Sequence, residues 1–141
     1  MANSAWTDNG DAMTRCGLIG IINDRSSEIR RIDEDIERLQ QAIQDIDRAV
    51  ENFDISINDM KVLEAEVILV FKGESAEAFI RKMQSYRSYC ERRVEQMLNL
   101  KANYSQQIKD LNYQKVVAQR VIDNINERLE RIRRIDVAIF K

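Results

Sequence analysis

Apolar residues in the first half of the chain recur at alternating intervals of three and four residues. This heptad spacing keeps one stripe of a helix facing a partner helix, and it predicts a coiled coil. The series runs for more than four heptads through Ile29, Ile32, Ile36, Leu39, Ile43, Ile46, Val50, Phe53, Ile57 and Met60. Leu63, Val67 and Val70 continue it after one further step of three, which predicts a stammer that locally overwinds the helix.

The second half of the chain repeats the apolar pattern less strictly and predicts a second long helix. Its first stretch comprises Phe79, Met83, Tyr86, Cys90, Val94, Met97, Leu100 and Tyr104, and its second comprises Ile108, Leu111, Ala118, Ile122, Ile125, Leu129, Ile132 and Ile139. The step from Tyr104 to Ile108 is expected to break the strict alternation between the two stretches.

A bend is predicted at residues 71–75, close to the midpoint of the 141-residue chain. Gly73 is the only glycine after Gly20, and glycine readily takes the left-handed conformation that ends a helix. Ser75 is a suitable cap for the helix that follows. The sequence therefore predicts an all-α fold, a long antiparallel two-helix coiled-coil hairpin whose arms have about equal length.

Charge supports pairing of the two arms. Residues 24–66 contain 13 acidic and 6 basic residues, a net charge of −7, whereas residues 75–141 contain 8 acidic and 14 basic residues, a net charge of +6. Opposite charge on the two arms favours their packing together. The absence of proline, with 33% charged residues and 6% aromatic residues, also suits a narrow coiled coil better than a thick globular core.

The domain organisation follows from these patterns. Residues 24–141 are assigned to the hairpin, and residues 1–23 to an N-terminal segment that is partly irregular or a short helix. Asn9, Gly10 and Asp11 are typical of a turn, and two further glycines weaken helix in this segment. If the segment instead lies along the end of the second arm, Trp6 would be near Ile139 and Phe140.

Catalytic chemistry is not indicated by the composition. The chain has no histidine, and its two cysteines are too few for a structural zinc site, so no enzyme activity, cofactor or metal is expected. A hairpin would separate Cys16 from Cys90 by roughly 57 Å along its axis, far beyond disulfide reach. Cys90 is therefore expected to be a small core residue. The arginine-rich segments are interleaved with acidic residues, which argues against nucleic-acid binding.

Membrane insertion and classical secretion are not predicted either. The longest apolar runs, residues 18–22 and 67–71, are far shorter than a bilayer-spanning helix. Residues 1–15 are polar and lack the apolar core of a cleaved signal. A cytoplasmic location is expected.

The segment from Phe71 to Phe79 resembles the turn of the WXG-type helical hairpins of bacterial type VII secretion. Phe71 stands where tryptophan is usual in that family, and Gly73, Ala76 and Phe79 match the positions that follow. These four residues are the turn and recognition motif that the resemblance implies, and Phe71 is expected to be anchored between the arms. The length of the arms is similar to that of the longer small helical proteins associated with LXG-type toxins.

The resemblance implies a non-catalytic adaptor or targeting chaperone that binds the helical N-terminal region of a type VII toxin, with a second small helical protein as a further partner. The exported members carry an aromatic residue followed four positions later by an acid, and no tyrosine here has that arrangement. Co-export with a partner or an accessory role in the cytoplasm is therefore expected.

The apolar heptad stripes through which the two helices pack are called the seam. Apolar residues outside the seam would be exposed to solvent in a hairpin, and they favour completion of a helical bundle with a partner. These residues are Ile55, Ile68, Ile80, Val116, Val117 and Val121. A homodimer would cover them equally well, so a self-associating structural coiled-coil protein stays open as the alternative.

Overall fold

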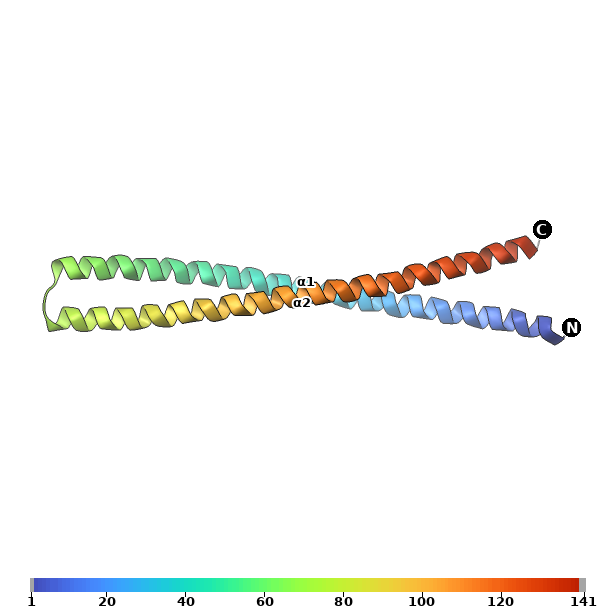
Figure 1. Cartoon of the computed structure of the whole chain (residues 1–141), viewed down its shortest axis with the longest axis horizontal. Helices are drawn as coiled ribbons and strands as arrows, with labels where there is room; N and C mark the ends of the chain where they lie inside the picture. Colours follow the sequence, from blue (N-terminus) through green and yellow to red (C-terminus); the bar gives the residue numbers. More distant parts are fainter. Residues whose placement is uncertain (1, 140–141) are drawn as a thin grey trace. The chain divides into compact units, whose positions relative to one another are not determined.

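The computed structural model describes the backbone of residues 2–139 and the side chains of residues 14–139. Two helices, α1 (Ala2–Val70) and α2 (Glu74–Ile139), pack against each other as a helical hairpin, and no strand occurs between residues 2 and 139 (Figure 1). The predicted fold class is confirmed. Contacts divide the chain into a terminal unit, Met1–Glu37 with Ile108–Lys141, and a tip unit, Arg38–Gln107. Each unit pairs a segment of α1 with a segment of α2.

The bend lies within the predicted residues and depends on one glycine. The Phe71 amide donates to the Val67 carbonyl at 2.9 Å, which is the last helical bond at the end of α1. Gly73 has a φ of +117°, a conformation that side chains disfavour, and its carbonyl accepts from the Glu77 amide at 3.1 Å. Gly73 therefore occupies the capping position of α2, and Ser75 lies inside the helix instead of capping it.

The N-terminal segment differs from its prediction. Helix α1 begins at Ala2 and continues through residues 9–11, so no turn or irregular stretch separates residues 2–23 from the hairpin. The physical reason is that the seam extends into this segment, since Leu18 is buried and Ile22 is half-buried. Their packing offsets the low helix propensity of the nearby glycines. The side chains of Trp6 and Phe140 lie outside the described residues.

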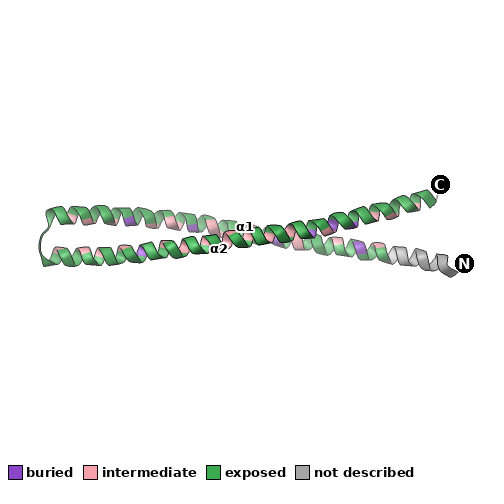
Figure 2. Cartoon of the chain, viewed as in Figure 1, coloured by how far each residue is buried: buried purple, intermediate pink, exposed green. Residues whose placement is uncertain are grey.

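The core is a single seam along each helix. Figure 2 shows isolated buried positions separated by exposed ones on both α1 and α2. Cys90 is the most completely buried side chain, which confirms its prediction as a small core residue, whereas Cys16 is exposed and both thiols are free. The remaining buried side chains are Leu18, Ile32, Ile46, Ile57, Ala118, Ile122 and Ile125.

The predicted stammer in α1 is wrong. Leu63 is 44% exposed, and the half-buried residue at this level of the seam is Glu64. The steps from Met60 to Glu64 and from Glu64 to Val67 are four and three residues, so the alternation continues unchanged. The regular helix keeps its heptad register, which avoids the overwinding that a seam position at Leu63 would require.

The same one-residue difference occurs in α2. The half-buried side chains are those of Ile80, Arg87 and Lys101, whereas the preceding residues, predicted as seam residues from their apolarity, are exposed. Those preceding residues are Phe79, Tyr86 and Leu100. With these positions corrected, intervals of four and three continue through residues 104 and 108, so the predicted break there is also wrong. Ile80, expected to be exposed, belongs to the seam.

Candidate functional site

Charged side chains occupy part of the seam in the tip unit and form ion pairs between the helices. Arg87 Nη1 lies 2.6 Å from Glu64 Oε2, and Gln84 Nε2 donates to Glu64 Oε1 at 2.8 Å. Lys101 Nζ lies 2.6 Å from Asp47 Oδ1. These pairs connect acidic residues of α1 to basic residues of α2, in agreement with the opposite net charges of the two arms.

Ion pairs also join the two helices in the terminal unit. Lys115 Nζ lies 2.7 Å from Asp33 Oδ1, and Arg15 of α1 pairs with Asp136 of α2. Arg87, Lys101 and Lys115 follow one another at intervals of 14 residues, so a cation occupies the same heptad position in every second heptad. Apolar periodicity alone does not reveal these positions, but the 14-residue repeat of cations is a signal that could have found them.

The turn motif is exposed at the bend. Phe71 is 62% exposed, so the expectation that its ring is anchored between the arms is wrong. Phe79 is also exposed, and Ala76 is half-buried. The structure brings these three side chains together around an open hollow of about 360 Å³, which Val67, Lys72 and Ser75 complete. Gly73 shapes the backbone beside the hollow and does not line it.

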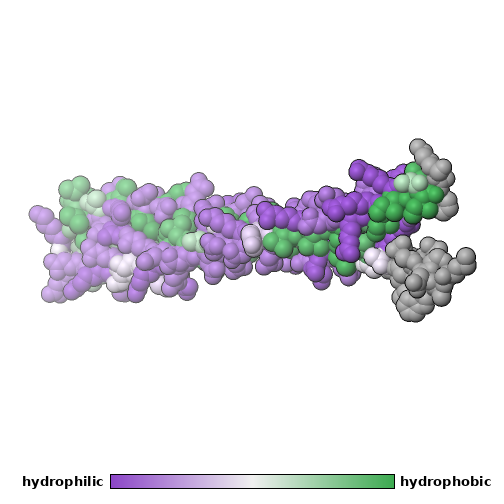
Figure 3. Space-filling model, turned by 45° about the vertical axis from the view of Figure 1, so that its right-hand side comes forward, coloured by the Kyte–Doolittle hydropathy of each residue, from purple (hydrophilic) through white to green (hydrophobic). Residues whose placement is uncertain are grey.

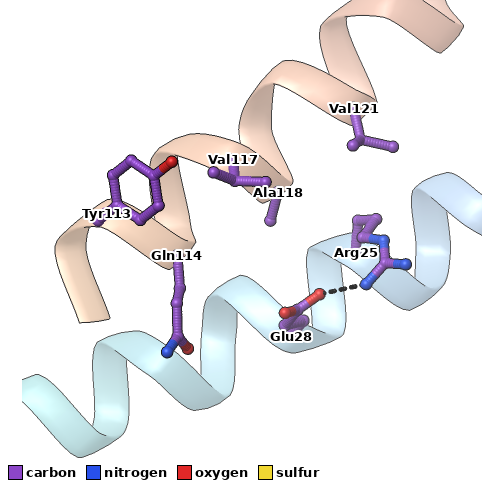
Figure 4. A pocket seen from close by; sticks show the side chains of 7 residues that line it. All are labelled: Arg25, Glu28, Tyr113, Gln114, Val117, Ala118 and Val121. Atoms are coloured by element: carbon purple, nitrogen blue, oxygen red, sulfur yellow. Dashed lines mark hydrogen bonds and ion pairs between the residues drawn. The ribbon is translucent and has the colours of Figure 1, made fainter. Parts of the chain in front are cut away.

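A second hollow lies between the helices of the terminal unit (Figure 4). It has a volume of about 340 Å³, and α2 supplies most of its lining, including Tyr113, Val117 and Val121. Arg25 and Glu28 of α1 close one side and are joined by an ion pair of 2.6 Å. Gln114 and Ala118 complete the lining. This terminal groove offers apolar side chains with a charged border, an arrangement suited to an amphipathic helix.

The tip unit has an apolar flank on one side of its seam. Seam positions along each helix are reached by alternating steps of three and four residues. In an antiparallel pair, the residues that immediately precede the positions reached by a step of four lie on the same side of the seam in both helices. In α1 these are Ala42, Ala49, Ser56, Leu63 and Val70, and in α2 they are Phe79, Tyr86, Arg93, Leu100 and Gln107. The only charged residue of this apolar flank is Arg93. Figure 3 shows hydrophobic side chains at the surface in patches between hydrophilic ones.

The opposite flank of the tip unit is charged. It is formed by the residues that immediately follow the other seam positions. Five of these ten residues are charged, and the ten are Gln40, Asp47, Asp54, Lys61, Ile68, Glu77, Gln84, Glu91, Leu98 and Ser105. The two flanks therefore present different chemistry, and the apolar one, with a single charged residue, is better suited to burial against another helical protein.

The described residues contain no group of three or more histidine, cysteine, aspartate or glutamate side chains that could hold a metal ion. Within the same part of the chain, no helix is long and apolar enough to cross a membrane. Comparisons of the chain with protein-family models, with characterised proteins and with solved structures found no match. The surface features of the hairpin are therefore the basis on which its function is inferred.

Proposed function

We propose that this chain is a non-catalytic helical partner protein that binds an amphipathic helix of another protein. The observation that carries the proposal is the terminal groove, in which apolar side chains of α2 are open to solvent between the two helices. Val117 is 42% exposed and Tyr113 is 69% exposed. The part of the chain that the structure describes contains no element beyond α1 and α2 that could cover them.

The mechanism is helix addition. An incoming helix lays its apolar stripe along the groove and contributes a third helix to the packing, while its polar face stays in water. Fully burying a valine or a similar side chain stabilises a complex by about 1.5–3 kcal/mol. Two or three such contacts supply about 3–9 kcal/mol before the cost of association. Micromolar affinity, about −8 kcal/mol, therefore requires further contacts along the hairpin.

The resemblance of the segment from Phe71 to Phe79 to the WXG-type turn supports a more specific proposal for the partner. It is the helical N-terminal region of a type VII toxin of the LXG type, and this chain acts as the toxin's adaptor or targeting chaperone in the cytoplasm. A second small helical protein would complete the bundle. In this proposal Phe71 and Phe79 form a recognition surface at the bend, and their exposure makes them accessible to a partner.

The test is a binding measurement with the purified helical N-terminal region of an LXG-type toxin. Val117→Lys places a charge in the terminal groove and is expected to weaken binding at least tenfold. Val116→Lys is the matched control, because Val116 immediately precedes Val117 in α2 and is similarly exposed but does not line the groove. Equal losses for both variants, or no binding by the wild-type chain, would contradict the proposal.

A separate variant, Phe71→Ala, tests the bend. Reduced binding at unchanged helicity would support a contribution of the turn motif to recognition. Unchanged binding would confine recognition to the groove.

A further inference from the structure

The apolar flank of the tip unit is separate from the terminal groove, and no residue between 14 and 139 covers it. Leu63, Phe79, Tyr86 and Leu100 belong to it, and each is between 41% and 59% exposed. They lie seven residues apart along each helix, or multiples of seven, so they stay on one side of the seam. Small residues of α1, Ala42, Ala49 and Ser56, continue the flank and leave room for close approach of another helix.

The rims of the apolar flank carry opposite charge. On the α1 side, the rim contains Asp45, Asp59 and Glu66 with the single base Arg38, a net charge of −2. On the α2 side, Lys82 is the only charged rim residue of the tip unit, and Arg93 of the flank itself adds a second positive charge beside it. Any occupant of this flank must therefore present a basic edge to α1 and an acidic edge to α2.

Aromatic residues on the α2 side are arranged as a preformed contact surface. The rings of Tyr86 and Tyr89 are stacked with centroids 6.3 Å apart. The Arg93 guanidinium lies 5.3 Å from the centroid of the Tyr89 ring, and Arg93 Nε donates to the Tyr89 hydroxyl at 3.0 Å. Tyrosine and arginine are the residue types that most often dominate binding energy at protein interfaces.

We propose that a second copy of this chain covers the apolar flank, so that two tip units pack face to face as a four-helix bundle. A copy of the chain supplies both required edges, since its own α1 rim is acidic and its own α2 rim is basic. The twofold axis runs parallel to the helices, the two bends lie at the same end, and α1 of each copy packs against α2 of the other. Such an interface is self-complementary.

The charges select this axis over the alternative. A twofold axis across the helices would pack α1 against the α1 of the other copy, and Asp45, Asp59 and Glu66 would then meet an acidic rim. Like charges brought together at an interface are unfavourable. With the parallel axis, the aromatic residues near the bend of one copy also lie opposite the region near the bend of the other copy, so that apolar surface packs against apolar surface.

Two contacts between the helices of the tip unit, Lys101 with Asp47 and Gln84 with Glu64, give the level at which residues of the two copies meet. Lys101 pairs with Asp47, and their residue numbers add to 148. Lys82 and Glu66 also add to 148, so they lie at the same level of the hairpin on opposite rims. In the proposed dimer, Lys82 of each copy therefore faces Glu66 of the other.

The first experiment is a mass measurement of the full chain in solution by light scattering after gel filtration. The monomer mass is 16.5 kDa, and the wild-type chain is expected at twice that mass. Leu100→Glu is expected to shift the dissociation constant at least tenfold toward monomer. Leu98→Glu is the matched control, because Leu98 is similarly exposed, at 46% against 41%, but lies on the charged flank. Circular dichroism verifies that both variants remain helical.

If Leu100→Glu fails to fold, Tyr86→Ser serves as the second variant on the same flank. A wild-type monomer at 100 µM, which is about the concentration at which a weak dimer forms, would overturn the proposal. Equal effects of the Leu98 and Leu100 substitutions would do so as well.

The second experiment tests the orientation by exchanging charges. Lys82→Glu is expected to weaken the dimer, and adding Glu66→Lys in the same chain is expected to restore it, because each lysine again faces a glutamate of the other copy. Failure of the double variant to restore association would overturn the parallel-axis arrangement. Phe79 belongs both to the turn motif and to the apolar flank, so it is left unchanged in these variants. Toxin binding is tested through the terminal groove and self-association through Leu100, Lys82 and Glu66, so the two losses are separately observable.

Discussion

Glu64 of α1 occupies a seam position and accepts a charge-assisted hydrogen bond from Arg87 of α2, with 2.6 Å between Oε2 and Nη1. The Glu64 side chain is only 12% exposed, and Gln84 also donates to it. Arg87→Ala would leave this carboxylate partly buried without its cation. We expect a loss of about 2 kcal/mol in the free energy of unfolding, since a buried charge without its partner is costly. Urea denaturation followed by circular dichroism measures it.

The double variant Glu64→Leu with Arg87→Leu is the control for this prediction. Replacing both partners of a buried ion pair with apolar residues is often neutral or stabilising, so the double variant is expected to be at least as stable as the wild-type chain. A double variant less stable than Arg87→Ala would mean that packing at these positions, and not the unpaired charge, determines the loss.

Lys101 occupies a seam position that an apolar residue would fill more favourably. Lys101→Leu is expected to raise the thermal unfolding midpoint, because the pair with Asp47 is partly exposed and contributes little. A polar residue at such a position fixes helix register and association state at a cost in stability. The variant is therefore also expected to form additional oligomers in sedimentation velocity. A lower midpoint would contradict a cost in stability at this position.

Two glycines are expected to respond oppositely to the same substitution. Gly73 has a φ of +117°, so Gly73→Ala forces a strained backbone and should lower the free energy of unfolding by about 1 kcal/mol. Gly20 lies inside α1 with open space around it, so Gly20→Ala should raise the free energy of unfolding by about 1 kcal/mol. Chemical denaturation of both variants provides the comparison, and a shared sign would contradict it.

The exposure of Phe71 makes the stability effect of its removal small. Burial between the arms would have implied a loss of about 3 kcal/mol for Phe71→Ala. With the ring 62% exposed, the expected loss is under about 1 kcal/mol. Thermal denaturation measures the difference, and a loss near 3 kcal/mol would indicate that the ring is buried in solution by another chain. The concentration dependence of the unfolding midpoint distinguishes that case.

The amino-acid sequence by itself determined the helices and the bend. The period of apolar residues identifies two coiled-coil helices, and only one glycine lies near the midpoint. Both are local properties, because heptad spacing and backbone freedom are fixed by residue type and by position along the chain. The same local information predicted wrongly where competing signals lay side by side, as at Asn9 to Asp11, where packing of the following seam residues maintains the helix.

Only the tertiary structure decided which of two adjacent residues enters the seam. At Leu63 and Glu64, at Tyr86 and Arg87, and at Leu100 and Lys101, the more apolar residue of the pair is exposed and the charged one is half-buried. A shift of one residue rotates a side chain by about 100° around the helix, so an unbroken register along the partner helix outweighs a single apolar side chain. The charged seam residues are tolerated because ions of opposite sign on the other helix pair with them, and those partners are distant in sequence. The exposure of Phe71 was also decided by the tertiary structure, because the burial of its ring depends on how α1 and α2 pack beside the bend.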